Sequence, residues 1–255
     1  MSFRKNSCPQ AVLYDNLTVM LKKTILGDLH EKSARMGESG GWAVPLEFHG
    51  QGDAESILSG GVGIFDLSHY SRLRLRGYSV PDMFDAVGVA GLASMDDNTV
   101  REINIADTRC TLVRLEDFWV VVAPPDANEL LLEKFRSADG VKADSQTMKV
   151  AMFALAGTTA RQTLAGVMPV KLPSLANGQA ISGSLMLANY IAYRNDVAGV
   201  PVINVMLPAI FASKAWNFIT MNAGRNCAMP LGIDVWNRLA FKNFFKMTSV
   251  CWRAF

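Results

Sequence analysis

Hydrophobic and polar residues alternate one by one in several segments of the chain, which is the pattern of half-buried strands. In residues 72–76 the apolar Leu73 and Leu75 lie between three arginines, so we expect one buried face and one face in water. Pro45 lies inside the extended segment Trp42 to Phe48, which predicts an edge strand or an entry loop. Strands are also predicted at residues 64–67, 100–106, 109–115, 118–123, 150–156, 184–194 and 200–207.

Other segments have apolar residues at intervals of three and four, which predicts helices. These segments are residues 17–37, 83–90, 127–137, 158–166 and 209–223. Gly37 is expected to end the first helix, and Asp126 is expected to cap the third. In the last helix, Trp216 and Phe218 are expected to face the core.

The order of these elements limits the fold class. Strands and helices alternate, but several connections between strands are too short for the crossover that parallel pairing requires. We therefore predict an α+β fold with mixed, largely antiparallel sheets. We expect an N-terminal lobe at 1–143, a second α+β lobe at 144–235 and an aromatic, basic C-terminal segment at 236–255.

The composition is that of a globular protein, with 50% hydrophobic and 19% charged residues. A net charge of +2 is too small to indicate a nucleic-acid partner. The N-terminal segment does not resemble a secretory signal, and no apolar run approaches the roughly 20 residues that span a membrane. We therefore expect a cytoplasmic protein without a membrane span.

The cysteines and histidines are too scattered to indicate a metal site. The four cysteines form no C-x-x-C pair, and His30, His49 and His69 are far apart in the sequence. This spacing supports neither structural zinc nor a disulfide framework. We expect no metal cofactor and reduced cysteines in or near the core.

The last twenty residues contain six aromatic residues and four basic ones, with no acid. The aromatic residues are Trp236, Phe241, Phe244, Phe245, Trp252 and Phe255. One interpretation is a terminal helix packed on its own core. A second is a surface that binds a partner subunit or another copy of the chain, because aromatic and basic residues are typical interface anchors. A helix on a membrane surface is a third interpretation.

Residues 60–77, GGVGIFDLSHYSRLRLRG, resemble the G-L-F-D-V-S-H signature of the glycine-cleavage T-protein (aminomethyltransferase) family. Four further segments resemble family motifs in the same order; they are residues 21–48, 151–167, 207–224 and 230–242. The resemblance implies two interlocked α+β lobes around a central opening that holds the pterin of tetrahydrofolate. It also implies transfer of one-carbon units.

The chain departs from the family at three positions that the resemblance makes functional: near Leu92, at Val200, and at Asp234, where the family has an arginine. The catalytic aspartate of the family falls near Leu92, and the nearest acids are Asp96 and Asp97. In the pterin loop, aligned with residues 193–201, Val200 replaces a glutamate. A carboxylate there would form charge-assisted hydrogen bonds of about 1.5–3 kcal/mol, and valine forms none.

Four other residues are candidate ligand contacts by the same resemblance. Arg194 matches the arginine of the pterin loop, and Arg238 matches the second of two arginines in a later motif, whose first falls on Asp234. Trp42 can stack on a ligand or fill the core, and His69 can contact a ligand or serve the structure.

Three functional hypotheses remain. The first is a non-catalytic, T-protein-like accessory subunit, because residues 154–172 also resemble the small gamma subunit of heterotetrameric sarcosine oxidase. The second is an active folate-dependent aminomethyltransferase or methyltransferase in which Asp96 or Asp97 replaces the lost acid. The third is a regulator that binds a different small molecule in the same opening.

Overall fold

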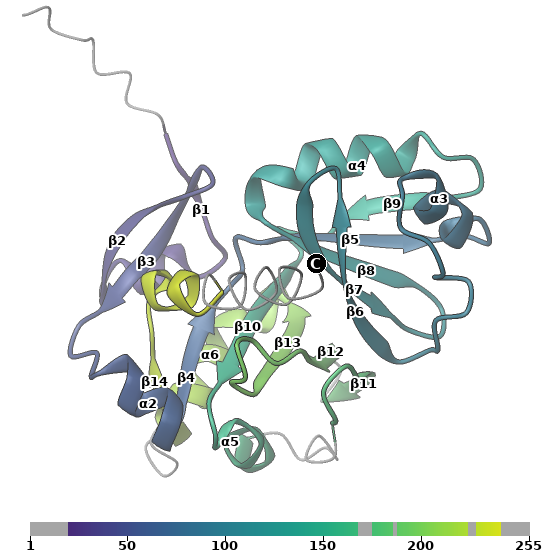
Figure 1. The fold of residues 1–255 in the computed structure, drawn as a ribbon. Helices are drawn as coiled ribbons and strands as arrows, with labels where there is room; N and C mark the ends of the chain where they lie inside the picture. Colours follow the sequence, from purple (N-terminus) through teal and green to yellow (C-terminus); the bar gives the residue numbers. More distant parts are fainter. Residues whose placement is uncertain (1–19, 168–174, 186–187, 224–227, 241–255) are drawn as a thin grey trace, which may run out of the picture.

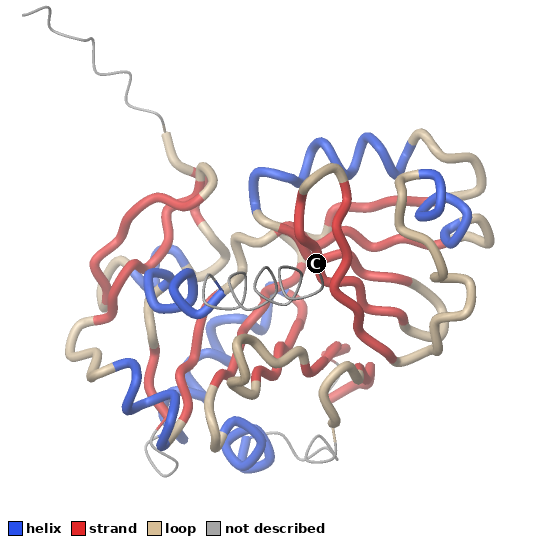
Figure 2. The backbone as a smooth tube through the Cα atoms, viewed as in Figure 1, coloured by secondary structure: helices blue, strands red, loops and turns tan. Residues whose placement is uncertain are grey.

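The computed structural model describes residues 20–167, 175–185, 188–223 and 228–240, whose strands form three sheets (Figure 1, Figure 2). The small sheet has the order β1-β3-β2. Its strands are β1 (Lys22–Lys23), β3 (Trp42–Phe48) and β2 (Ala34–Ser39), and the helix α1 (Gly27–His30) connects β1 to β2.

The central sheet has six strands in the order β11-β12-β13-β10-β4-β14. They are β11 (Ala180–Leu185), β12 (Ala188–Arg194), β13 (Val202–Pro208), β10 (Val150–Ala156), β4 (Val62–Asp66) and β14 (Ala228–Pro230). The helices beside it are α2 (Ala54–Gly60), α5 (Ala160–Val167) and α6 (Ala212–Ala223), which follows a 3-10 turn at Ala209–Phe211. β4 is buried at every position, and its residues from Val62 to Phe65 are accordingly apolar without alternation.

The outer sheet has five strands in the order β6-β7-β8-β5-β9. They are β6 (Thr99–Ile105), β7 (Thr108–Arg114), β8 (Trp119–Ala123), β5 (Ser71–Arg76) and β9 (Lys142–Ser145). The helices beside it are α3 (Val80–Ala86) and α4 (Asn128–Arg136), which follows a 3-10 turn at Pro125–Ala127. Ala106 and Asp107 both have positive φ, which is the geometry of the tight turn that closes the β6–β7 hairpin.

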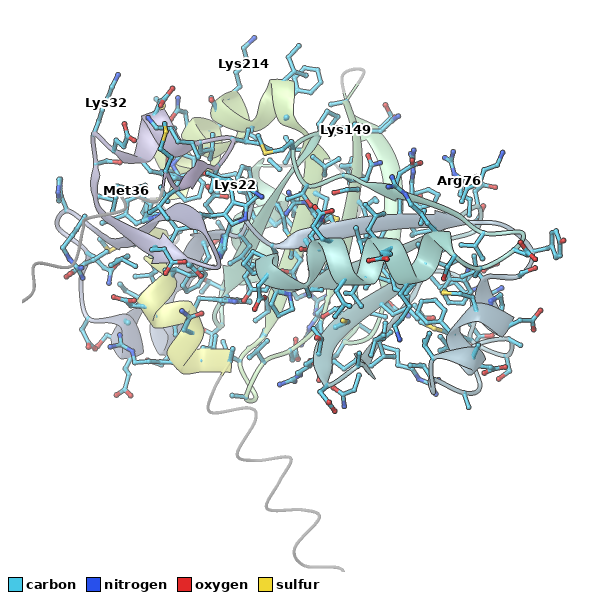
Figure 3. The ribbon with its side chains drawn as sticks, turned by 90° about the horizontal axis from the view of Figure 1, so that it is seen from above. Lys22, Lys32, Met36, Arg76, Lys149 and Lys214 are labelled. Atoms are coloured by element: carbon cyan, nitrogen blue, oxygen red, sulfur yellow. The ribbon has the colours of Figure 1, made fainter. Side chains whose placement is uncertain are left out.

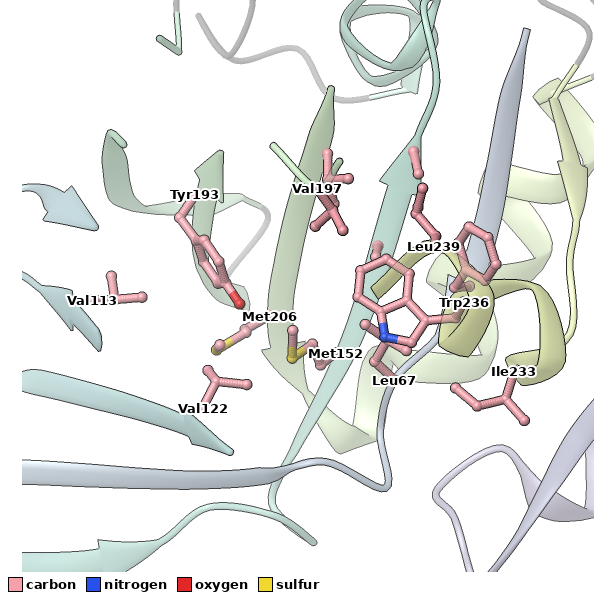
Figure 4. Packing of buried hydrophobic residues seen from close by; sticks show 14 of the residues in the cluster. Leu67, Val113, Val122, Met152, Tyr193, Val197, Met206, Ile233, Trp236 and Leu239 are labelled. Carbon is pink, nitrogen blue, oxygen red and sulfur yellow. The ribbon is translucent and has the colours of Figure 1, made fainter. Parts of the chain in front are cut away.

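Three hydrophobic clusters hold these layers together. One lies between the central sheet and helices α5 and α6, and another lies between the outer sheet and helices α3 and α4. The third cluster joins the two large sheets to each other, and it includes Val122 of β8, Met152 of β10 and Met206 of β13 (Figure 4). The two large sheets therefore face each other across a shared apolar interface.

The predicted fold class is confirmed. Among the described strand pairs, only β1–β3 and β4–β14 are parallel. The structure does not test the proposed boundaries at residues 143 and 235, which remain predictions. The central sheet combines β4 with strands that follow residue 144, so the two halves of the chain are interleaved.

Several local predictions were wrong. The segment 17–37 is not one helix: its described residues form β1, the four-residue α1 and most of β2, because Ala34–Ser39 pairs with β3. The single strand predicted at 184–194 is divided between β11 and β12, which pair antiparallel. The sequence patterns also missed α2, β9 and β14.

Three predictions about individual side chains were also wrong. Asp126 does not cap α4, whose N-cap is Ala127 without a side-chain hydrogen bond. Phe218 is 52% exposed, whereas Trp216 is buried as expected. The arginine face of β5 is not uniformly in water, because the central sheet covers part of it and buries Arg72 completely. No helix in the described part of the chain is long and apolar enough to cross a membrane.

Candidate functional site

A cavity of about 220 Å³ lies between the central and outer sheets. Its walls come from β6, β7 and β8 on one side and from β10, β12 and β13 on the other. Tyr70, in the loop after β4, and Trp236, in the helical segment 233–240, complete the lining. The cavity thus lies where the two halves of the fold meet.

Glu102 is the only acidic residue among the described residues that line this cavity. Its Oε2 lies 2.5 Å from a guanidinium nitrogen of Arg109, and its Oε1 accepts a hydrogen bond of 3.2 Å from the Asn195 side chain. Both carboxylate oxygens are therefore already occupied by partners. Because a carboxylate has about four lone-pair sites, these two contacts orient Glu102 and partly neutralise its charge, and one lone pair on each oxygen is left.

The thiol and the two phenols in the lining are neutral near pH 7. Burial raises the pKa of the Cys110 thiol to about 12, so the reactive thiolate is scarce. Burial also raises the pKa values of Tyr70 and Tyr193 above the usual phenol value. Tyr70 accepts a hydrogen bond of 3.1 Å from the Trp236 indole, while the side-chain oxygen of the buried Asn204 has no partner among the described residues.

Apolar side chains fill much of the space beside these polar groups. Figure 4 shows Val113 and Val122 of the outer sheet opposite Met152, Met206 and Tyr193 of the central sheet. All five are less than a tenth exposed. The cavity is therefore small and apolar over much of its wall, and among the described residues its one acid is paired with an arginine.

A buried polar cluster supports the wall of the cavity from the loop after β4. The Asp66 carboxylate accepts hydrogen bonds of 2.9 Å from the His30 ring and from the Ser68 backbone. Burial raises the pKa of Asp66, but the hydrogen bond and charge of His30 and the bonds from Ser68 outweigh it, so the pKa is lowered. Asp66 is therefore ionised and acts only as an acceptor.

His69 lies in the same loop and is buried, with its Nδ1 unpaired and its ring edge-on to Tyr70. Burial lowers the pKa of His69 from 6.5 to about 4; the Asp66 charge opposes this shift, and the Arg72 charge adds to it. His69 is therefore neutral near pH 7. It lines none of the four cavities described here.

This burial makes stability depend on pH. Between pH 6.5 and about 4 the unfolded chain binds a proton at His69 that the folded protein does not, so the free energy of unfolding falls as the pH falls. We expect His69→Leu to remove about 3 kcal/mol of this loss between pH 7 and pH 4, as measured by urea unfolding. The exposed His49→Gln is the control, and an unchanged pH dependence in His69→Leu would contradict the assignment.

The other sequence-predicted contact residues do not gather around the central cavity. Trp42 is buried beside a hollow of about 660 Å³, with the Lys22 ammonium 5.7 Å above its ring. Arg194 is held by Asp196, with both nitrogen–oxygen distances at 2.8 Å, and lines none of the four cavities. Arg238 is exposed beside a separate hollow of about 500 Å³ near α2.

The catalytic candidates also lie away from the cavity. Asp96 and Asp97 are exposed in the loop before β6, and Asp97 pairs with Arg114 at 2.6 Å. Leu92 is completely buried in the cluster beneath α3 and α4 and does not line the cavity. The absence of an acid at position 92 therefore does not determine whether the cavity wall contains one. Val197, from the loop aligned with the family's pterin loop, does line the cavity.

Sequence reasoning missed the Glu102–Arg109 pair. Both residues lie in the predicted strands 100–106 and 109–115, and the observed register places them diagonally across the β6–β7 hairpin. The two-residue turn at 106–107 could have fixed this register in advance. The described residues contain no group of three histidine, cysteine or acidic side chains arranged for a metal ion.

The model of the GCVT N-terminal domain matches residues 26–245. The chain belongs to the GCVT N-terminal domain family. Two curated family relatives are aminomethyltransferases, from Corynebacterium jeikeium (25% identical, 84% of this chain and 59% of the relative) and Herpetosiphon aurantiacus (27% identical, 87% and 63%). The chain thus spans about three fifths of the length of these relatives.

Two solved structures share the fold of this family member. Glycine cleavage aminomethyltransferase T from Bartonella henselae has a TM-score of 0.72 and 19% identity, over 86% of this chain and 62% of that one. A chain of heterotetrameric sarcosine oxidase from Corynebacterium sp. U-96 has a TM-score of 0.57 and 15% identity, over 82% of this chain and 98% of that one. Both structures support the fold that the sequence motifs implied.

Proposed function

We propose that this protein is a non-catalytic, T-protein-like accessory subunit in tetrahydrofolate-linked one-carbon metabolism of the cytoplasm. The state of Glu102 carries the proposal: the one acid in the central cavity is bound to Arg109 and Asn195. A transfer reaction needs a free carboxylate near the reacting nitrogen, as a base or as an electrostatic partner. Within the described residues, the lining of the cavity has no carboxylate that is free of an arginine.

The size of the cavity supports the same proposal. Pockets for small-molecule ligands usually measure about 300–1,000 Å³. The central cavity measures about 220 Å³ and is narrowed by Met152 and Tyr193, so tetrahydrofolate does not fit it as it stands. We therefore derive no reaction step through this cofactor.

Resemblance to a whole chain of a heterotetramer supports a role as a subunit. We place the contact with the partner protein, or with a second copy, on the aromatic C-terminal segment. Trp236 itself is not available for this contact, since it is buried against Phe65 and bonded to Tyr70. Residues 241–255 lie outside the described part of the chain. Isolation of the native protein as a reproducible monomer would contradict this proposal.

Titration with tetrahydrofolate tests the proposal directly. We expect no saturable heat in calorimetry up to about 1 mM ligand, the concentration that corresponds to a binding free energy of about −4 kcal/mol. Met152→Ala is the informative companion variant, because it enlarges the cavity without touching the Glu102 pair. Saturable binding to the unaltered protein, together with folate-dependent one-carbon transfer, would overturn the proposal.

Membership in a family with aminomethyltransferases favours one alternative, an active folate-dependent aminomethyltransferase or methyltransferase with a rearranged site. In that case Glu102 would exchange Arg109 for the substrate, and Glu102→Gln would abolish single-turnover transfer. Asp97→Asn is the matched control, because Asp97 is exposed and lies outside the cavity. Loss of transfer in Asp97→Asn and not in Glu102→Gln would instead identify Asp97 as the catalytic acid, as the sequence suggested.

A further inference from the structure

A groove of about 560 Å³ opens between the same two sheets, beside the central cavity. On β8, Val122 lines the cavity and Val120, two residues away on the same face, lines the groove. Unlike the cavity, the groove has a volume within the usual range for small-molecule sites. It is therefore a separate binding volume at the interface of the sheets.

The groove has a positive wall and no acidic one. Arg72, Arg74 and Arg76 come from alternate positions of β5, so they share one face of the outer sheet. No aspartate or glutamate is among the lining residues. In the next strand, Lys142 lies directly opposite Arg76 and Asp144 lies opposite Arg74, so this strand adds one positive and one negative charge beside the groove.

The three arginines are not equivalent. The guanidinium of Arg72 donates hydrogen bonds to four backbone carbonyls in the loops after β4 and β9, so it stabilises these loops. One terminal guanidinium nitrogen of Arg74 forms a long ion pair with the Asp144 carboxylate, at 3.7 Å. The buried Nε of Arg74 has no partner among the described residues. Arg76 is exposed, its guanidinium lies 5.6 Å from the centre of the Phe118 ring, and it projects to the same side of the molecule as Lys149 (Figure 3).

The rest of the groove suits an apolar body with a polar edge. Phe118 and Ile191 provide aromatic and apolar surface, while Ser182 and Asn189 provide hydroxyl and amide groups. Guanidinium groups bind carboxylate and phosphate oxygens through paired hydrogen bonds. Residues two apart on a strand are about 7 Å apart, so two long arginine side chains can reach one oxyanion.

We propose that this groove binds a small organic anion, with its carboxylate or phosphate group between Arg74 and Arg76 and its apolar part against Phe118 and Ile191. The proposal does not depend on the central cavity or on folate chemistry. In this proposal, the guanidinium groups of Arg74 and Arg76 bind the ligand, and the buried Arg72 stabilises the adjoining loops.

Calorimetric titration with phenyl phosphate and with phthalate tests the site, with inorganic phosphate as the probe that lacks the apolar part. We expect saturable binding of at least one aromatic anion. Arg74→Gln and Arg76→Gln are each expected to weaken it about tenfold, which corresponds to loss of one charge-assisted contact. Arg101→Gln, an exposed arginine of β6 outside the groove, is the control and should leave the affinity unchanged.

Urea unfolding of the same variants shows whether they are folded, so that a folding defect is not mistaken for lost binding. We expect both variants to fold, because glutamine keeps most of the aliphatic part of the arginine side chain. The preferred aromatic anion identifies the phosphate or the carboxylate as the natural group. Three results would overturn the proposal: no binding of any probe, binding that Arg74→Gln and Arg76→Gln leave unchanged in folded protein, or equal affinity for phenyl phosphate and inorganic phosphate.

Discussion

Arg72→Met is expected to destabilise the protein by about 4 kcal/mol or more. The Arg72 side chain is completely buried, and its guanidinium donates to the carbonyl oxygens of Leu67, Ser68, Tyr70 and Thr147 at 2.5–3.3 Å. The Leu67 carbonyl keeps the Tyr70 backbone N–H as a donor, but the other three carbonyls lose the guanidinium, and each hydrogen bond to a charged group contributes about 1.5–3 kcal/mol. The free energy of unfolding in urea measures the loss.

The fixed fork of the guanidinium explains why lysine is not an adequate substitute at position 72. A lysine ammonium has three donors on a flexible stem, so Arg72→Lys is expected to recover less than half of the lost stability. The exposed Arg101→Met is the matched control on the same sheet. A loss below about 1 kcal/mol in Arg72→Met would show that water or neighbouring groups satisfy the four carbonyls.

Asp66→Ala is expected to cost about 3–5 kcal/mol, because it breaks a fully buried pair with His30. The His30 ring lies edge-on to Phe48 and Trp216, so it cannot turn toward water to find another partner. Urea unfolding at pH 7 measures the effect. Because the pKa of Asp66 is lowered in the folded protein, the stabilisation is present above the usual aspartate pKa and is lost as the pH falls through the lowered value.

A double-mutant cycle separates the pair from the rest of the core. His30→Phe fits the aromatic surroundings, and the double variant with Asp66→Leu replaces both polar partners by apolar groups. We expect the double variant to be more stable than Asp66→Leu alone, since no buried histidine is left without its partner and the Ser68 N–H loses its acceptor equally in both. Additive losses from the two single changes would contradict a direct coupling between His30 and Asp66.

The buried position of His69 shows what a motif can and cannot reveal. The signature at residues 60–77 identified the scaffold, and the structure confirms that its apolar residues Phe65 and Leu67 belong to the core between the sheets. The same motif could not show whether His69 faces a ligand or the interior. That depends on residues far away in the sequence, since β10 and β13 enclose the loop after β4.

The sequence alone determined most strands of the two large sheets and the family, because apolar alternation and local motifs are read within one segment. It predicted both strands of the β6–β7 hairpin, but not that Glu102 and Arg109 meet there. Only the tertiary structure decided that Arg72 is buried while Arg76 is exposed, although both lie on the same face of one strand. The physical reason is that the central sheet covers one end of that face, and the packing of two sheets leaves no periodic signal in either strand.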